Sequence, residues 1–273
     1  MEAYLSPLCP INFADSEDTH NGELERVYIQ QFVKGDCINL QLVGEYDITV
    51  YANIGSITVN STVHPINDDV CAYNISIDTT LLDTFCLYNI EVHANKVEYR
   101  TFTAKTLIEI VDDCQNLKLI EYYDKQNITP FNTYFNSNGL DILRFYLRLP
   151  VGYKSTSYTE QIESETFRNQ KQELKMLYAY PYRQKSLIIG CGLGVPTWVG
   201  RLLNYIFCLS NVSIEAERVV RSGDAVPERQ DGLTDYPLHI YNMTVESYEN
   251  IIYPRYDYKN GDYNNDFTND FNR

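Results

Sequence analysis

Residues 47–78 read DITVYANIGSITVNSTVHPINDDVCAYNISID, and this stretch decides the fold of the first half of the chain. It consists of short runs rich in Val, Ile, Thr and Tyr in which apolar and polar positions alternate. Polar turns separate the runs at residues 53–55 and 65–69. Alternation with period two is typical of strands with one buried face, and turns at this density indicate short antiparallel strands.

The same pattern extends outward from about residue 36 to residue 111. Further runs follow at 86–94 (CLYNIEVHA), 97–104 (VEYRTFTA) and 106–111 (TLIEIV). About seven strands of this kind predict an Ig-like β-sandwich over residues 31–112. The segment TTLLDTF at 79–85 is the nearest candidate for a helix here, and it is no longer than one turn.

Residues 113–250 predict a second β-rich domain, so the fold class is mainly β. The segment 156–176, TSYTEQIESETFRNQKQELKM, is expected to form paired strands with a polar bend near residues 169–172. A helix is the alternative, because Glu, Gln and Lys favour helices. Strands are preferred because no apolar stripe with helical spacing appears before Leu174.

One α-helix is expected at about residues 196–210. Pro196 stands at its start, where the missing N–H does no harm. The apolar residues that follow recur with helical spacing and are predicted to form structural core: Trp198, Leu202, Leu203 and Ile206.

The two ends of the sequence are polar and lack periodicity. Residues 1–30 are interpreted as an extended N-terminal arm, ordered by packing on a neighbour or on another part of the chain. Residues 251–273, rich in Asn, Asp and Tyr, are interpreted as a flexible C-terminal tail.

Charge and hydropathy exclude several classes of protein. The 273 residues carry 37 acidic and 22 basic side chains, a net charge of −15, which argues against a nucleic-acid partner and against an anionic membrane surface. No apolar run approaches the roughly 18 residues of a membrane span. The first twenty residues lack the basic and apolar regions of a secretory signal, so synthesis in a cytoplasm is expected.

No motif predicts catalysis, a cofactor or a metal. Residues 190–194, GCGLG, resemble a dinucleotide fingerprint, but the third glycine comes one position early and Val195-Pro196 occupies the helix entrance. A structural turn is therefore favoured there. The seven cysteines lack metal-binding spacing, and DYNNDFTND at 262–270 is a weak calcium candidate without the EF-hand glycine and final Glu.

Tyrosine is the most distinctive residue, with 24 copies. Amphipathic aromatic side chains in such an acidic chain suit protein–protein contacts. Packing within one subunit is the alternative for the first cluster. The interface candidates are Tyr178, Tyr180, Tyr182 and Arg183, together with Tyr256, Tyr258 and Tyr263 in the tail.

Five motifs follow one another in the second half of the chain: FRNQ (167–170), LYAYPYRQKSLIIG (177–190), GVPTWVGRLLNYIFCLS (194–210), VVRSG (219–223) and YPLHIY (236–241). By the order of these motifs, this part of the chain resembles structural proteins from the tail or baseplate region of phages and prophages of Bacteroidetes-type bacteria. CPINF at 9–13 agrees with these proteins in style only.

The resemblance implies a non-enzymatic virion protein, made in the host cytoplasm and assembled into a ring or hub of the tail. Its partners would be copies of itself and other tail proteins, held through β-domain faces and the terminal arms. The alternative is a carbohydrate-binding or adhesion module at a tail tip, with tyrosines that stack on sugars. A glycan hydrolase is a third hypothesis, and it rests only on the abundance of acidic residues.

Overall fold

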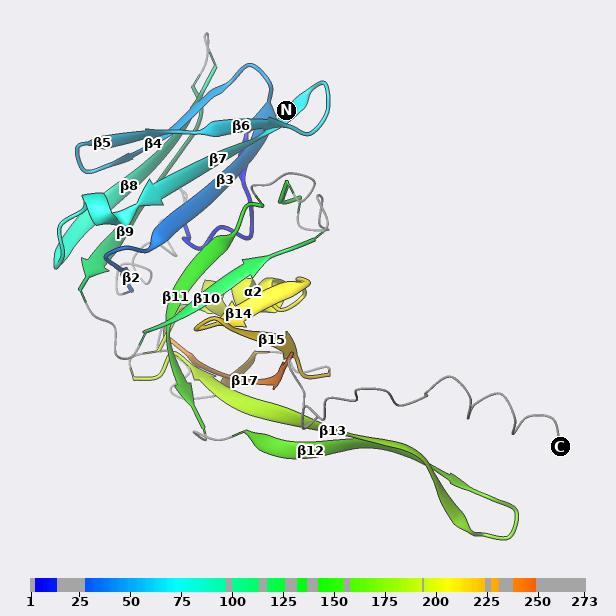
Figure 1. The fold of residues 1–273 in the computed structure, drawn as a ribbon. Coiled ribbons are helices and arrows are strands. Elements are labelled where there is room, and N and C mark those ends of the chain that lie inside the picture. The colour runs from blue at the N-terminus through cyan, green and yellow to red at the C-terminus, as the bar shows by residue number, and fades with distance from the viewer. Residues whose placement is uncertain are drawn as a thin grey trace, which may run out of the picture.

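The computed structural model shows two β-rich bodies and one long hairpin that projects from the second body (Figure 1). Strands dominate the described residues, and α2 is the only α-helix among them, so the predicted mainly-β fold with one helix is confirmed. The described residues are 3–13, 28–96, 100–112, 117–125, 132–136, 142–154, 158–192, 194–223, 227–230 and 238–248.

The first body is a sandwich of two sheets. One sheet has the strand order β1-β3-β7-β6 and the other has the order β2-β9-β8-β4-β5. Among the described strands, only β2 and β9 pair in parallel. The strands of the first sheet are β1 (Tyr4–Leu5), β3 (Cys37–Glu45), β7 (Val70–Asp78) and β6 (Thr62–Pro65). Those of the second are β2 (Gln30–Val33), β9 (Arg100–Val111), β8 (Cys86–Asn95), β4 (Thr49–Ile54) and β5 (Ile57–Asn60).

The predicted alternation of apolar residues fills the space between these sheets. Ile38, Leu40 and Leu42 on β3 are fully buried, as are Ile90 and Val92 on β8. Side chains of a strand alternate between its two faces, so every second residue reaches the core. The segment predicted as the nearest helix candidate contains a single 3-10 turn, η1 (Thr79–Leu81).

The second body is a closed antiparallel barrel. Six strands pair in the order β13-β11-β10-β14-β15-β17, and β17 pairs again with β13, which closes the ring. The short strand β16 (Glu228–Gln230) pairs with β17 outside this ring. The barrel strands are β10 (Leu117–Tyr123), β11 (Phe145–Tyr153), β13 (Leu174–Ile189), β14 (Asn211–Ile214), β15 (Glu217–Arg221) and β17 (Ile240–Ser247).

Helix α2 (Thr197–Ile206) begins directly after Pro196, as predicted, and ends four residues before the predicted boundary. Its buried face consists of Val199, Leu202, Leu203 and Ile206, at the spacing i, i+3, i+4 and i+7 of an amphipathic helix. Trp198 packs against the core but stays partly exposed. The tryptophan therefore lies at the edge of the core, because Val199 occupies the centre of the buried face.

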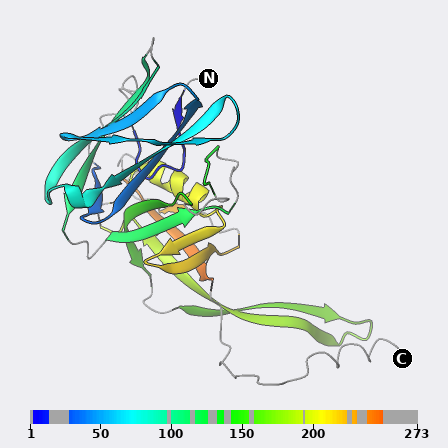
Figure 2. The same cartoon turned by 45° about the horizontal axis from the view of Figure 1, so that its top comes forward.

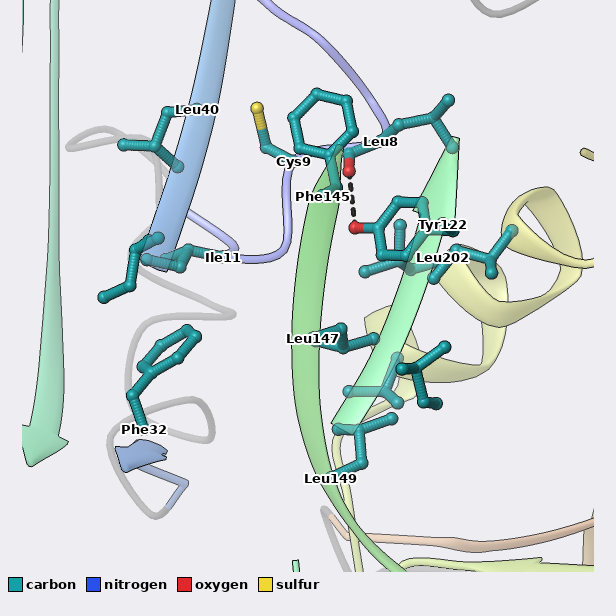
Figure 3. Close-up of a cluster of buried hydrophobic side chains, with 14 of the residues drawn as sticks. Leu8, Cys9, Ile11, Phe32, Leu40, Tyr122, Phe145, Leu147, Leu149 and Leu202 are labelled. Carbon is teal, nitrogen blue, oxygen red and sulfur yellow. Dashed lines mark hydrogen bonds between the residues drawn. The ribbon is translucent and has the colours of Figure 1, made fainter. Parts of the chain in front are cut away.

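Residues 3–13 pack on their own chain. β1 pairs with β3, and Leu8, Cys9 and Ile11 are buried. The Tyr122 hydroxyl of β10 donates a hydrogen bond of 2.7 Å to the Leu8 carbonyl oxygen (Figure 3). Burial raises the pKa of the Cys9 thiol to about 12. This part of the predicted arm is thus ordered by its own chain, which was one of the two possibilities, whereas residues 14–27 and the predicted tail 251–273 lie outside the described residues.

The two bodies share one hydrophobic core and a largely buried ion pair. Phe32 of the sandwich and Leu147 of the barrel belong to the same cluster of buried side chains. Arg148 on β11 donates two hydrogen bonds to Asp36, of 2.6 and 2.8 Å, and both side chains are at most 13% exposed. Together these contacts fix the sandwich against the barrel. The described part of the chain contains no helix with the length and hydropathy of a membrane span.

Candidate interaction site

The projecting hairpin consists of β12 (Thr159–Arg168) and the first ten residues of β13. Figures 1 and 2 show that it extends away from both bodies. Only residues 184–189 of β13 lie in the barrel, between β11 and β17. No described part of the chain therefore forms a second layer over the faces of the hairpin.

The bend at the tip of the hairpin is a specific structure. The side-chain oxygen of Asn169 accepts hydrogen bonds from the backbone N–H groups of Lys171 and Glu173, both at 2.9 Å. The Asn169 N–H donates to the Glu173 carbonyl at 3.0 Å, and Gln172 takes a positive φ of 65°. An asparagine that closes a turn with its own side chain is common in tight bends. The predicted polar bend at residues 169–172 is thus confirmed.

One face of the hairpin carries the tyrosine cluster. Tyr178 stands opposite Glu165, and Tyr180 stands opposite Glu163. The Tyr178 and Tyr180 ring centroids are 5.4 Å apart, and Tyr180 is 63% exposed. Partial desolvation of the hydroxyl, with the negative charges of Glu163 and Glu165, raises the pKa of Tyr178. The tyrosine hydroxyl is therefore a neutral donor at physiological pH.

The opposite face of the hairpin carries several exposed apolar side chains. Ile162 faces Pro181 across the strands, and Thr166 and Arg168 face Met176 and Leu174. Ile162 and Met176 are 70% and 67% exposed, values that are unusual for large apolar side chains in a strand. Because alternate residues of β12 share a face, these side chains form one surface. We call the residues Ile162, Leu174, Met176, Ala179 and Pro181 the apolar face.

A register shift interrupts the hairpin between Glu165 and Thr166. On β13 the paired residues change from Tyr178 to Met176, so Leu177 has no partner on β12 and is 59% exposed. An extra residue of this kind is a β-bulge, which bends the strand and redirects side chains. The bulge therefore leaves Leu177 exposed to solvent on the hairpin.

Two ion pairs lie at the base of the hairpin, one within it and one with the barrel. Arg183 pairs with Glu160 across the hairpin at 2.9 Å. Lys185 pairs with Glu217 of β15 at 2.7 Å, and its ammonium lies 3.9 Å from the Tyr158 ring centroid. The cation thus joins the start of β12 to the barrel. β13 itself runs as a single continuous strand from the tip of the hairpin into the barrel.

The predicted interface residues divide between the hairpin and the end of the chain. Tyr178, Tyr180, Tyr182 and Arg183 lie on the hairpin, where Tyr182 and Arg183 are half-buried near its base. The remaining candidates, Tyr256, Tyr258 and Tyr263, lie outside the described residues. The predicted interface did not include the exposed apolar residues of the hairpin, which are Ile162, Phe167, Leu174, Met176 and Leu177.

The glycine-rich segment 190–194 forms a turn between β13 and α2. Gly190 and Gly194 have positive φ angles of 84° and 87°. A Cβ at Gly190 would lie 2.7 Å from the His239 carbonyl oxygen, and one at Gly194 would lie 2.9 Å from the Leu238 Cβ. Val195 and His239 exchange backbone hydrogen bonds of 2.8 and 2.7 Å. The glycines therefore allow close packing of the chain against residues 238–239, as the structural-turn interpretation predicts.

The remaining candidates for a chemical site are a buried histidine and groups of residues that could bind a metal ion. The His93 ring stacks on Tyr51 with centroids 4.9 Å apart and lies 3.5 Å from a Glu91 carboxylate oxygen. Within the described ranges, no three His, Cys, Asp or Glu side chains are grouped to hold a metal ion. The calcium candidate at 262–270 lies outside those ranges.

A shallow groove of about 310 Å³ runs between residues 3–13 and α2, and Trp198, Arg201 and Tyr205 line its helical side.

No protein-family model and no curated protein matches the chain. The hairpin, with solvent on both faces and a structured tip, is the most distinctive surface of the described chain.

Proposed function

We propose that this chain is a non-enzymatic structural subunit of a phage virion, assembled into a ring or hub of the tail or baseplate region. The observation that supports the proposal is the projecting hairpin with its exposed apolar face. Each large apolar side chain left in water forgoes about 1.5–3 kcal/mol of burial free energy. A protein surface of this kind marks a site that another polypeptide covers.

The isolated geometry of the hairpin also favours an assembly role. A two-stranded hairpin without a third strand or a second layer is marginally stable in water. Contact with a neighbouring subunit would add that layer and stabilise the hairpin. An arm that contacts its neighbour in this way lets repeated subunits hold one another with one reused interface.

The first experiment tests the role of the apolar face. Light scattering and electron microscopy of the full chain are expected to show an oligomer, whereas Ile162→Ser with Met176→Ser should give a smaller species with an unchanged unfolding midpoint. The matched control is Leu81→Ser with Leu87→Ser, which changes two exposed leucines on the sandwich. The control should assemble like the unmodified chain.

The second experiment tests the virion role. Mass spectrometry and image reconstruction of particles from a phage that encodes the chain should find it in the tail region. A chain that never enters particles, and stays monomeric with its tail partners present, would contradict the proposal.

Glycan binding is the second candidate, because Tyr178 and Tyr180 present neighbouring rings beside the acceptor groups of Glu163 and Glu165. Binding on a glycan array that disappears in Tyr180→Ala, with assembly unchanged, would favour this function.

A further inference from the structure

The outer part of the hairpin is basic, in contrast with the rest of the molecule. Residues 166–177 contain Arg168, Lys171 and Lys175 but only one acidic residue, Glu173, so this segment has a net charge of +2. The whole chain has a net charge of −15, so the remainder carries −17. Opposite charges of this size steer association and select partners. A second copy of this chain therefore has the charge that the tip attracts.

The hairpin tip points away from the sandwich of its own chain. In Figures 1 and 2 the hairpin and the end of the sandwich formed by the β3–β4 and β6–β7 turns lie at opposite ends of the molecule. Contact between these two ends thus requires two molecules.

The far end of the sandwich contains an acidic hollow of about 340 Å³. The hollow lies between two turns that β3 and β7 bring together, since Glu45 pairs with Val70 in the sheet. Six residues line it, and we call them the acidic end: Glu45, Tyr46, Asp47, Asp68, Asp69 and Val70.

The acidic end keeps an excess of negative charge. Lys96 contacts Glu45 at 2.8 Å and Asp47 at 3.2 Å, and its hydrogen bond lowers the pKa of Glu45 to about 2. Among the described residues no ion pair involves Asp68 or Asp69. The positive charges of Lys96 and of the N-terminal amine, both of which lower the pKa of Glu45, thus oppose four carboxylates.

The acidic end also offers an apolar contact. The Tyr46 side chain is 65% exposed at its rim. A tyrosine ring next to carboxylates is complementary to a tip that carries leucine and methionine next to lysine. The acidic end is therefore complementary to the hairpin tip both in charge and in its apolar contact.

We propose that the hairpin tip of one copy docks into the acidic end of the next copy, head to tail. This inference rests on the proposed assembly role and names the partner surface. Lys171 and Lys175 would face Asp68 and Asp69, while Leu174 and Leu177 would approach Tyr46. Because the two surfaces differ, the contact is heterologous, and repetition closes a ring or extends a filament.

Charge reversal on each surface tests the contact. The tip variant is Lys171→Glu with Lys175→Glu, and the acceptor variant is Asp68→Lys with Asp69→Lys. Each variant alone should have a dissociation constant for self-association at least about tenfold higher than that of the unmodified chain, measured by analytical ultracentrifugation at low salt. An equimolar mixture should recover association, because each altered surface then finds an opposite charge on the other variant.

A matched control separates this contact from net charge. Lys34→Glu with Lys125→Glu makes the same charge change as the tip variant at exposed positions elsewhere. The control should self-associate like the unmodified chain. Added salt should weaken the self-association of the unmodified chain, because it screens the charges. Circular dichroism and unfolding midpoints verify that all variants fold.

Three results would overturn the inference. These are undiminished association of both reversed variants, equal weakening in the control, and a mixture that does not recover. If Ile162→Ser with Met176→Ser abolishes assembly while charge reversal has no effect, the assembly role stands and the acidic end is not the acceptor. An unmodified chain that stays monomeric when purified alone but enters particles would likewise refute self-docking while leaving the virion role intact.

Discussion

Gly200 shows how a single missing side chain positions α2 against the barrel. A Cβ at this residue would lie 2.5 Å from the Tyr241 Cζ, closer than real Cβ contacts allow. The sequence predicted the buried residues Leu202, Leu203 and Ile206 from their spacing. It could not predict the contact of Gly200, because Tyr241 comes from a strand about forty residues later.

Gly200→Ala is therefore expected to destabilise the chain. In a solvent-exposed helix this change would stabilise by about 1 kcal/mol. Here the added methyl meets a tyrosine ring, and overpacking typically costs about 1–3 kcal/mol. Chemical denaturation should show a lower midpoint with an unchanged slope. The double variant with Tyr241→Leu should lose less unfolding free energy than the sum of the two single changes. A raised denaturation midpoint for Gly200→Ala alone would contradict the packing argument.

The hairpin is the element whose existence the sequence predicted and whose exposure it did not. The absence of a helical stripe before Leu174 and the polar residues at 169–172 correctly predicted two strands and a bend. The exposure of Ile162 and Met176 could not be predicted, since apolar residues at alternate positions normally indicate a buried face. Whether a second layer covers that face depends on the whole fold. The tyrosine cluster was found because YAYPY is conspicuous in the sequence, whereas the apolar face requires the cross-strand register.

Asn169→Ala should loosen the tip without unfolding the two bodies. The change removes the acceptor for the Lys171 and Glu173 N–H groups, and each lost hydrogen bond is worth about 0.5–1.5 kcal/mol. Hydrogen exchange should accelerate at the backbone amides of residues 166–177 and stay unchanged in β8 and β10. Asn169→Asp with Glu173→Gln serves as the control, because it keeps the acceptor oxygen and avoids placing two carboxylates at the 2.6 Å that separates the Asn169 amide from Glu173. Unchanged exchange in Asn169→Ala would show that this side chain does not hold the bend.

At the scale of the whole molecule, long-range pairing determines what local patterns leave open. The sandwich was predictable because its strands follow one another with clear turns. Closure of the barrel was not, because it depends on β13 pairing with β17 across the intervening helix and hairpins. The contact between the bodies was equally hidden, since Asp36 and Arg148 are separated by 112 residues. No local signal connects two such positions.

Asp36→Ala tests how strongly the two bodies are joined. Removing the carboxylate leaves the Arg148 guanidinium largely buried without its main partner, and breaking such pairs costs about 3–5 kcal/mol. Denaturation with urea should reveal this loss in the free energy of unfolding. The control is Glu121→Ala, which breaks the more exposed pair with Arg144 and should cost about 1 kcal/mol or less. Equal effects of the two changes would refute a special role for the pair between the bodies.

The continuity of β13 has a mechanical consequence. The same strand forms one side of the outer hairpin and, through residues 184–189, a strand of the barrel that pairs with β11 and β17. Tension applied at the tip runs along this strand and loads several backbone hydrogen bonds in shear at once, instead of peeling them apart one by one. Force applied at the bend at Asn169 is thus transmitted along β13 to the barrel.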